Sequence, residues 1–419
     1  MGLETIIEGE NQMSSNRKLL SALIVLALLI SLMPVSAFAA NEALVSSQFP
    51  DMPNDWSTPA LESAIYNGLL NGIDGKIAPG ENLTRAQMAT IVVRAFGATV
   101  KGNITAFPDV KPSDWFSDYL AIAYQMGIIK GADGKMKPDD AITREEVFVI
   151  LARALKLAPS DTVNKSFLDL GDLSTWAKGE TYSLINNGYI NGSDGYLFPK
   201  QNITRAETAQ LFFNIIKQYF SLEGTYTAVN SGNIMINTPG VTLKNLTVSG
   251  DLIVGDGVGD GEVILDNVKI DGRLVVRGGG ENSIIIRGAS SVSSVIVSRV
   301  DGAVSVKVQG DANVEVIYIV DGSDDVRIEG SVGTVEVAAS GIAVTTEGAT
   351  IENMRVTAAD STVVVGEGST VKTLEVAPTA SNAAVQVTGT VTTINTSAAG
   401  THVTGSGKVA EVKAQVGAT

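Results

Sequence analysis

Residues 83–87 read LTRAQ, and nearly the same stretch returns as ITREE at 142–146 and as ITRAE at 203–207. In each copy a Thr stands three residues before a Gln or Glu, and apolar residues at helical spacing follow. Thr-x-x-Gln/Glu is the capping box, in which two side chains satisfy free amides at a helix start. The three stretches therefore predict three helix starts, 59 and 61 residues apart.

Each of these helix starts closes a longer repeat. The repeat opens with Phe-Pro-Asp at 49–51 and 107–109 and with Phe-Leu-Asp at 167–169, and a Trp and a first helical stretch follow. An Asp-Gly pair, which supplies positive φ to a turn, and a Pro then precede the helix start. We predict three repeats, at 49–100, 107–160 and 167–220. The turn pairs are Asp74 with Gly75, Asp133 with Gly134, and Asp194 with Gly195.

An Arg occupies the first helical position in all three copies, as Arg85, Arg144 and Arg205. Its charge opposes the positive end of the helix dipole, where Asp or Glu would be more stable. A guanidinium beside free N-terminal amides makes a compact site for a carboxylate or phosphate. The alternative interpretation is an Arg that pairs with a nearby Asp, such as the one in the turn.

The Trp residues of the repeats, Trp56, Trp115 and Trp176, also allow two interpretations. A lone Trp at a helix start is commonly a core residue. Alternatively, its ring is an apolar platform for the C–H face of a sugar, with the polar edge left in water.

These motifs together, in three copies over residues 49–220, resemble the S-layer homology (SLH) family. The resemblance implies a helical, pseudo-threefold, three-pronged module whose grooves bind pyruvylated secondary cell-wall polysaccharide attached to peptidoglycan. It implies that Arg85, Arg144 and Arg205 bind the ketal carboxylate, and that the Trp residues and the Asp-Gly pairs shape the grooves. Lys76 and Lys135 match the basic position that follows the Gly, whereas the third copy has Tyr196. The third copy departs most from the family, since Leu168 replaces Pro and Thr175 replaces the Asp before Trp.

The C-terminal part consists of short β-branched runs divided by Gly, Asp and Asn. Residues 241–254 align with 263–276 at an offset of 22, and later copies recur every 16–22 residues. Period-two strands at this spacing predict a parallel β-solenoid over 233–419, after a linker at 221–232. This part resembles the parallel β-helix repeats of bacterial surface proteins; a β-sandwich array is the alternative. Asn245 and Asn267 are predicted rungs of an internal Asn ladder.

Acidic residues lie beside Gly in the solenoid turns, where they increase solubility or, alternatively, bind calcium. They are Asp251, Asp256, Asp260, Glu262, Asp321, Asp324 and Asp325. After Phe220 the only aromatic residues are Tyr226 and Tyr318, although carbohydrate subsites usually need aromatic platforms. We therefore expect that the protein is not an enzyme and needs no cofactor. Stacked coils still bring distant carboxylates together, so a wall-tethered polysaccharide lyase or hydrolase, or an adhesin, is the alternative.

Arg17 and Lys18 precede an apolar run and an Ala-x-Ala site, which predicts a signal peptide at 1–39, with translation starting at Met13. We expect a secreted protein at the cell wall or S-layer surface without a membrane span; a membrane anchor is the alternative.

The net charge of −15 argues against nucleic-acid binding. A chain with no Cys has no disulfides, and the single His402 leaves little room for His-based or zinc chemistry. The last solenoid repeat ends without an obvious polar cap, so we expect either that the last residues cap it poorly or that it stacks on a partner or a second copy.

Overall fold

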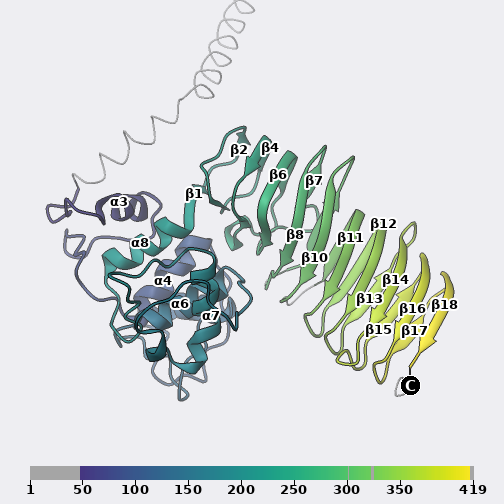
Figure 1. Ribbon diagram of the computed structural model, residues 1–419, viewed down its shortest axis with the longest axis horizontal. Coiled ribbons are helices and arrows are strands. Elements are labelled where there is room, and N and C mark those ends of the chain that lie inside the picture. Colours follow the sequence, from purple (N-terminus) through teal and green to yellow (C-terminus); the bar gives the residue numbers. More distant parts are fainter. Residues whose placement is uncertain (1–47, 301, 322–324, 416–419) are drawn as a thin grey trace, which may run out of the picture.

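The structure is a computed structural model that describes residues 48–300, 302–321 and 325–415. The predicted signal peptide, its cleavage site and the start at Met13 lie outside these residues. A helical part is followed by a long stack of strands that runs to the C-terminus (Figure 1). The α-helices are α3 (Thr58–Tyr66), α4 (Arg85–Phe96), α5 (Ser117–Gln125), α6 (Arg144–Ala154), α7 (Lys178–Asn186) and α8 (Arg205–Ile215). Short 3₁₀ helices cover Leu170–Asp172, Thr175–Ala177 and Asp256–Val258.

The six α-helices of the described residues pair across block boundaries. The second helix of each block packs on the first helix of the next, so α4 contacts α5 and α6 contacts α7. The pairing then returns to the beginning, because α8 of the last block packs on α3 of the first. Apolar faces such as that of Met88 and Phe96 in α4 are fully buried between the pairs. The three blocks therefore close on one another through one shared core.

A ring of backbone hydrogen bonds joins the three blocks where α4, α6 and α8 begin. Leu83 donates to the carbonyl of Ile203 (3.0 Å), Ile203 to that of Ile142 (3.1 Å), and Ile142 to that of Leu83 (3.0 Å). All three side chains are fully buried. The three predicted helix starts therefore meet at one centre.

The predicted capping boxes are confirmed in all three copies. Thr84, Thr143 and Thr204 each accept a hydrogen bond from the amide three residues on. The Gln or Glu at that position accepts in return from the amide of the Thr. The helices therefore begin where the sequence predicts.

The C-terminal part is a parallel β-solenoid of about ten coils, so the β-sandwich alternative is wrong. One row of inward residues runs Val254, Val276, Val297, Ile319, Val337, Val356 and Val376, at steps of 18 to 22 residues. All are fully buried, as stacking of period-two strands requires. The strands are β1 (Ile216–Phe220), β2 (Gly224–Tyr226), β3 (Asn233–Ile236), β4 (Val241–Val248), β5 (Leu252–Val254), β6 (Val263–Val276), β7 (Ile285–Arg287), β8 (Ser291–Val297), β9 (Val304–Val308), β10 (Asn313–Ile319), β11 (Val326–Val337), β12 (Ala343–Val356), β13 (Thr362–Val365), β14 (Thr370–Val376), β15 (Ala384–Val387), β16 (Thr390–Thr396), β17 (His402–Thr404) and β18 (Lys408–Ala414).

The solenoid begins earlier than predicted. Strand β1 follows α8 without a break and pairs in parallel with β3. Strand β2 lies inside the predicted linker, 221–232, and pairs with β4. The linker prediction is therefore wrong, and β1, at the end of the predicted third repeat, is a rung of the first coil.

The predicted internal Asn ladder is also wrong. Asn245 and Asn267 are exposed, with φ of 54° and 55°, at a corner between two faces of the solenoid. Asn267 accepts a hydrogen bond from the amide of Ala289 in the next coil (2.9 Å). Gly288 and Gly310 occupy the same corner with φ of 67°. The corner requires left-handed backbone, which Asn and Gly tolerate best.

Three of the seven solenoid acids named from the sequence pair with arginines of later coils. Asp251 contacts Arg273 (2.6 Å), Asp256 contacts Arg277 (2.7 Å) and Asp260 contacts Arg299 (2.7 Å). Within the described residues, no group of three His, Cys, Asp or Glu side chains is placed to hold a metal ion. The pairs of Asp251, Asp256 and Asp260 therefore link coils of the solenoid. Asp324 lies outside the described residues.

The helical part packs on the outer face of the first coils. Outward side chains of β3, β5, β6 and β8 join the core of the helices: Met235, Ile253, Val275 and Ile296. Arg273 donates to the carbonyl of Lys156 (2.8 Å) just beyond α6, and Asn237 donates to the carbonyl of Ala95 (2.6 Å) in the last turn of α4. These side chains satisfy carbonyls that a helix end leaves free. Helices and solenoid are therefore joined by a continuous buried interface.

The last coil leaves apolar residues of β17 and β18 in solvent, among them Val403 and Val412. Stacking of this coil on a partner stays a prediction. Over the part of the chain that the structure describes, no helix combines the length and hydrophobicity that a membrane span needs.

Candidate functional site

All three Trp side chains are on the surface. Their exposed fractions are 60% for Trp56, 60% for Trp115 and 54% for Trp176. The interpretation as core residues is therefore wrong. Three large aromatic rings at equivalent positions are thus exposed for contact with a ligand.

The Asp-Gly pairs form the tips of three equivalent tight turns. In the first, Asp74 and Gly75 have φ of 49° and 75°, and Ile73 and Lys76 exchange two backbone hydrogen bonds (2.8 and 2.9 Å). The other two copies repeat both features at 132–135 and 193–196. Positive φ at both central residues defines a type I′ turn, which favours Asp-Gly. The predicted turn chemistry is confirmed, and Lys76 and Lys135 lie exposed at the tips.

The Asp of the opening motif holds each turn in place, a role that the sequence analysis missed. Asp51 accepts from the amides of Ile77 and Ala78 (both 2.8 Å). The equivalent carboxylates of Asp109 and Asp169 also accept two amides each, at 2.7 to 3.1 Å. The repeated Asp in the opening motif was the available signal. The contact therefore joins the start of each block to the turn of the same block. The Trp of the block follows this start in the sequence.

Acid should weaken these contacts. Burial raises the pKa of the Asp51 carboxyl, but its hydrogen bonds to Ile77 and Ala78 outweigh burial, and the net pKa is lowered. The pKa of the Asp109 carboxyl is lowered in the same way, because hydrogen bonds from the amides of Lys137 and Met136 outweigh burial. A lowered folded-state pKa gives stability above the unfolded pKa of about 3.9, which is lost as the pH falls through the folded value.

We therefore expect the thermal midpoint of the protein to fall below about pH 4. The double variant Asp51→Asn, Asp109→Asn should lose less of its midpoint than the wild type between neutral and acidic pH. Differential scanning calorimetry checks this, and parallel acid curves for the two proteins would contradict it.

The amides of all three arginines are hydrogen-bonded, so the prediction of free amides at these helix starts is wrong. The amide of Arg205 donates to the carbonyl of Glu81 in the first block (2.9 Å). The amide of Arg85 donates to the carbonyl of Asp140 (3.0 Å), and that of Arg144 donates to the carbonyl of Gln201 (2.9 Å). Both acceptors belong to the following block, whose backbone covers the helix start.

The guanidinium groups of the same two arginines also contact the following block. Nε of Arg85 donates to the carbonyl of Met136 (3.0 Å), and its Nη1 pairs with Glu146. Arg144 repeats this with the carbonyl of Leu197 (2.7 Å) and with Glu207 (2.6 Å). These two arginines follow the alternative interpretation, although their partner is the capping-box Glu and not the turn Asp.

Arg205 differs from the other two. It is 4% exposed, and it donates from Nε to the carbonyl of Ile77 (2.7 Å) and from Nη2 to the carbonyl of Asn71 (2.6 Å). The capping-box residue of the next block is Gln87, which carries no charge. Burial lowers the pKa of Arg205 by more than the charge of Asp51 raises it. An Arg nevertheless remains protonated at neutral pH.

The third block also makes an aromatic contact through Tyr196 and an ion pair through Lys200. Tyr196, at the position of the two turn lysines, stacks on Phe198 with ring centroids 5.3 Å apart. Lys200 pairs with the buried Glu145 of the second block (2.6 Å), which also bonds Ser174. This network fills the junction between the second and third blocks, and the sequence analysis missed it.

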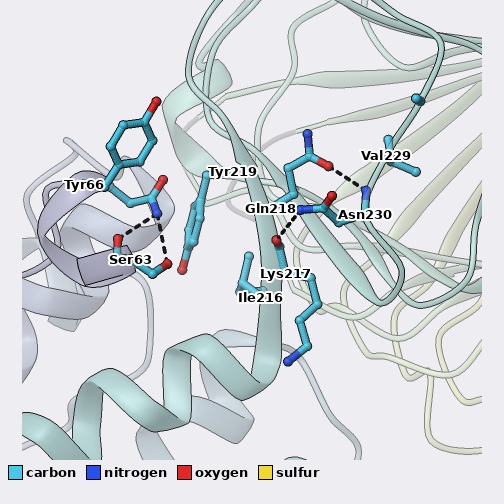
Figure 2. A pocket seen from close by; sticks show the side chains of 10 residues that line it. Ser63, Tyr66, Ile216, Lys217, Gln218, Tyr219, Val229 and Asn230 are labelled. Carbon is cyan, nitrogen blue, oxygen red and sulfur yellow. Dashed lines mark hydrogen bonds between the residues drawn. The ribbon is translucent and has the colours of Figure 1, made fainter. Parts of the chain in front are cut away.

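A pocket of about 160 Å³ lies where the helices meet the solenoid, away from the predicted site residues. Its lining comes from α3, β1 and residues 228–230, and Figure 2 shows Tyr219 beside Ser63. The hydroxyl of Tyr219 is buried without a hydrogen-bond partner, and burial raises its pKa.

Comparison with known protein families finds a match to two segments of the helical part. The S-layer homology domain matches residues 48–89 and 106–148. The third block lies outside the matched segments but repeats the turn, the Asp contacts and the capping box of the first two.

The chain is similar to S-layer proteins over about half its length. It is 29% identical to S-layer protein sap of Bacillus anthracis over 220 residues, 50% of this chain and 26% of that protein. It is 31% identical to S-layer protein EA1 of the same species over 194 residues, 44% of this chain and 22% of that protein. Exoglucanase XynX of Acetivibrio thermocellus is 30% identical over 179 residues, 41% of this chain and 16% of that protein. The chain thus spans about a quarter or less of these relatives, and the matches support an SLH surface protein.

Proposed function

We propose that this protein anchors itself non-covalently to the bacterial cell wall and presents its solenoid outward, without enzymatic activity. Three SLH repeats over residues 49–220 form one pseudo-threefold module that binds pyruvylated secondary cell-wall polysaccharide attached to peptidoglycan. The protein is exported by its signal peptide. The observation that carries the proposal is the threefold recurrence of an exposed Trp and of a tight Asp-Gly turn in the same block.

The chemistry of the repeats suits an acidic glycan. Exposed Trp rings offer platforms for the apolar faces of sugars. Arg205 and the lysines at the turn tips supply local positive charge in a protein whose net charge is −15, whereas Arg85 and Arg144 are each paired with a Glu. Several weak grooves on one chain bind a polymer with greater avidity than any single groove.

The solenoid gives little support for the lyase or hydrolase alternative. Exoglucanase XynX matches this chain only in the SLH region, so its enzymatic name is not transferred to the solenoid. The carboxylates of Asp251 and Asp256 in the solenoid form ion pairs with arginines. We therefore propose that the solenoid is a rigid structural element displayed at the surface.

The triple variant Trp56→Ala, Trp115→Ala, Trp176→Ala tests this function. We expect at least about a tenfold loss of affinity for isolated cell walls, because each groove loses its apolar platform. The measurement is co-sedimentation of the full chain with walls. The side chains are mostly exposed, so the thermal midpoint should stay close to that of the wild type.

Leu222→Ala is the matched control, because it removes an exposed apolar side chain (72% exposed) from the solenoid side. It should bind walls like the wild type. Undiminished wall binding by the triple Trp variant would overturn the proposed function.

A further inference from the structure

The three arginine sites are alike in backbone but not in charge. In each, Nε of the Arg donates to the carbonyl of the residue that follows the next block's turn, namely Met136, Leu197 or Ile77. Two sites add a carboxylate, from Glu146 at Arg85 and from Glu207 at Arg144. The site at Arg205 has Gln87 at the equivalent position, so it carries one negative charge fewer.

The capping box explains why this single difference matters. Glu146 and Glu207 each use Oε2 for the amide of the capping Thr and have Oε1 left for Nη1 of the Arg. Gln87 has only one oxygen, and the amide of Thr84 takes it (3.0 Å). Its remaining polar atom, Nε2, is a donor and cannot accept from an Arg.

The result is a pair of unused donors at the junction of the third and first blocks. Among the described residues, neither Nη1 of Arg205 nor Nε2 of Gln87 has a hydrogen-bond partner. Neither atom is fully buried, so both are reached by solvent. At the two other sites, the protein's own carboxylate fills this place.

We propose that the Arg205–Gln87 site is where a ligand carboxylate binds, and that Gln in place of Glu at position 87 selects it from the three. This rests on the proposed function and names the site for the acidic group of the wall glycan. A carboxylate oxygen of the ligand takes the position that Oε1 of Glu146 or Glu207 takes at the other sites. It accepts from Nη1 of Arg205 and Nε2 of Gln87, as in the charge-assisted pairs at the other two sites.

The variant Gln87→Glu tests the proposal, because it supplies the missing carboxylate from within the protein. The variant should fold, since Glu already serves the capping box in the second and third blocks. We expect it to pair with Arg205, to raise the thermal midpoint, and to lower the affinity for purified pyruvylated polysaccharide at least fivefold. Isothermal titration of the full chain measures the affinity.

The double variant Gln87→Glu, Glu207→Gln controls for net charge, since its total charge equals that of the wild type. It frees Arg144 in the way that Arg205 is free in the wild type, so binding should return to within fivefold of the wild type. Titration with the same polymer after hydrolysis of its ketal pyruvate, and with inorganic phosphate, shows whether a carboxylate is the group bound.

The outcomes separate this proposal from the proposed function. If the wild type binds the polymer and Gln87→Glu loses less than fivefold, only the site assignment is overturned. Failure of the double variant to regain binding also overturns the site assignment alone, whereas equal binding of the polymer without pyruvate overturns both. A wild type that does not bind the polymer at all overturns both.

Discussion

Replacing Arg277 with Ala is expected to lower the free energy of unfolding by about 3–5 kcal/mol. The side chain is fully buried between the helices and the solenoid, with its guanidinium 5.3 Å from the ring centroid of Phe96. Its Nε and Nη2 contact the carboxylate of Asp256 at 2.7 and 3.2 Å. Removal of Arg277 would leave that buried carboxylate without its counter-ion at the interface of the two parts.

The matched control is Arg287→Ala, which removes the equivalent kind of pair from the surface. Arg287 contacts Asp266 at 3.0 Å, and its side chain is 43% exposed. An exposed ion pair contributes at most about 1 kcal/mol. Urea unfolding of both variants measures the difference, and equal losses would show that burial of the Arg277 pair is not what holds the interface.

Replacing Gly330 with Ala is expected to cost more than about 3 kcal/mol. Gly330 has φ of 88° at a corner of the solenoid, where β11 stacks on β9. A Cβ at this position would overlap the carbonyl oxygen of Val308 in the preceding coil. The substitution therefore adds left-handed strain and forces two coils apart.

Gly341→Ala separates these two effects. Gly341 has φ of 73°, but a Cβ there would meet no atom within 4 Å. Only the left-handed strain remains, which costs about 1–2 kcal/mol. Thermal unfolding compares the two variants. If they lose the same stability, the close stacking of coils at Gly330 is not a constraint.

Local motifs explain why most of the helical part could be predicted from the sequence. A capping box and an Asp-Gly turn are decided by residues within a few positions of one another, and both occur as expected. The partners of the arginines could not be predicted in this way. Arg85 pairs with Glu146 of the next block, so the contact depends on how the three blocks close on each other.

In the solenoid, the coil offset held a signal that the sequence analysis did not use. The repeat of 22 residues places Asp251 below Arg273, and the shorter step of 21 places Asp256 below Arg277. An acid followed by an Arg at this distance therefore predicts an ion pair. The boundary at Ile216 was harder to predict, because α8 passes directly into β1 through apolar residues that suit either element.

The most direct test of wall anchoring is isothermal titration of the full chain with purified pyruvylated secondary cell-wall polysaccharide. The same polymer, with its ketal pyruvate removed by mild acid, serves as the reference. The account predicts saturable binding of the first polymer and at least about a tenfold weaker binding of the second. Equal affinity for both polymers, or binding to neither, would contradict it.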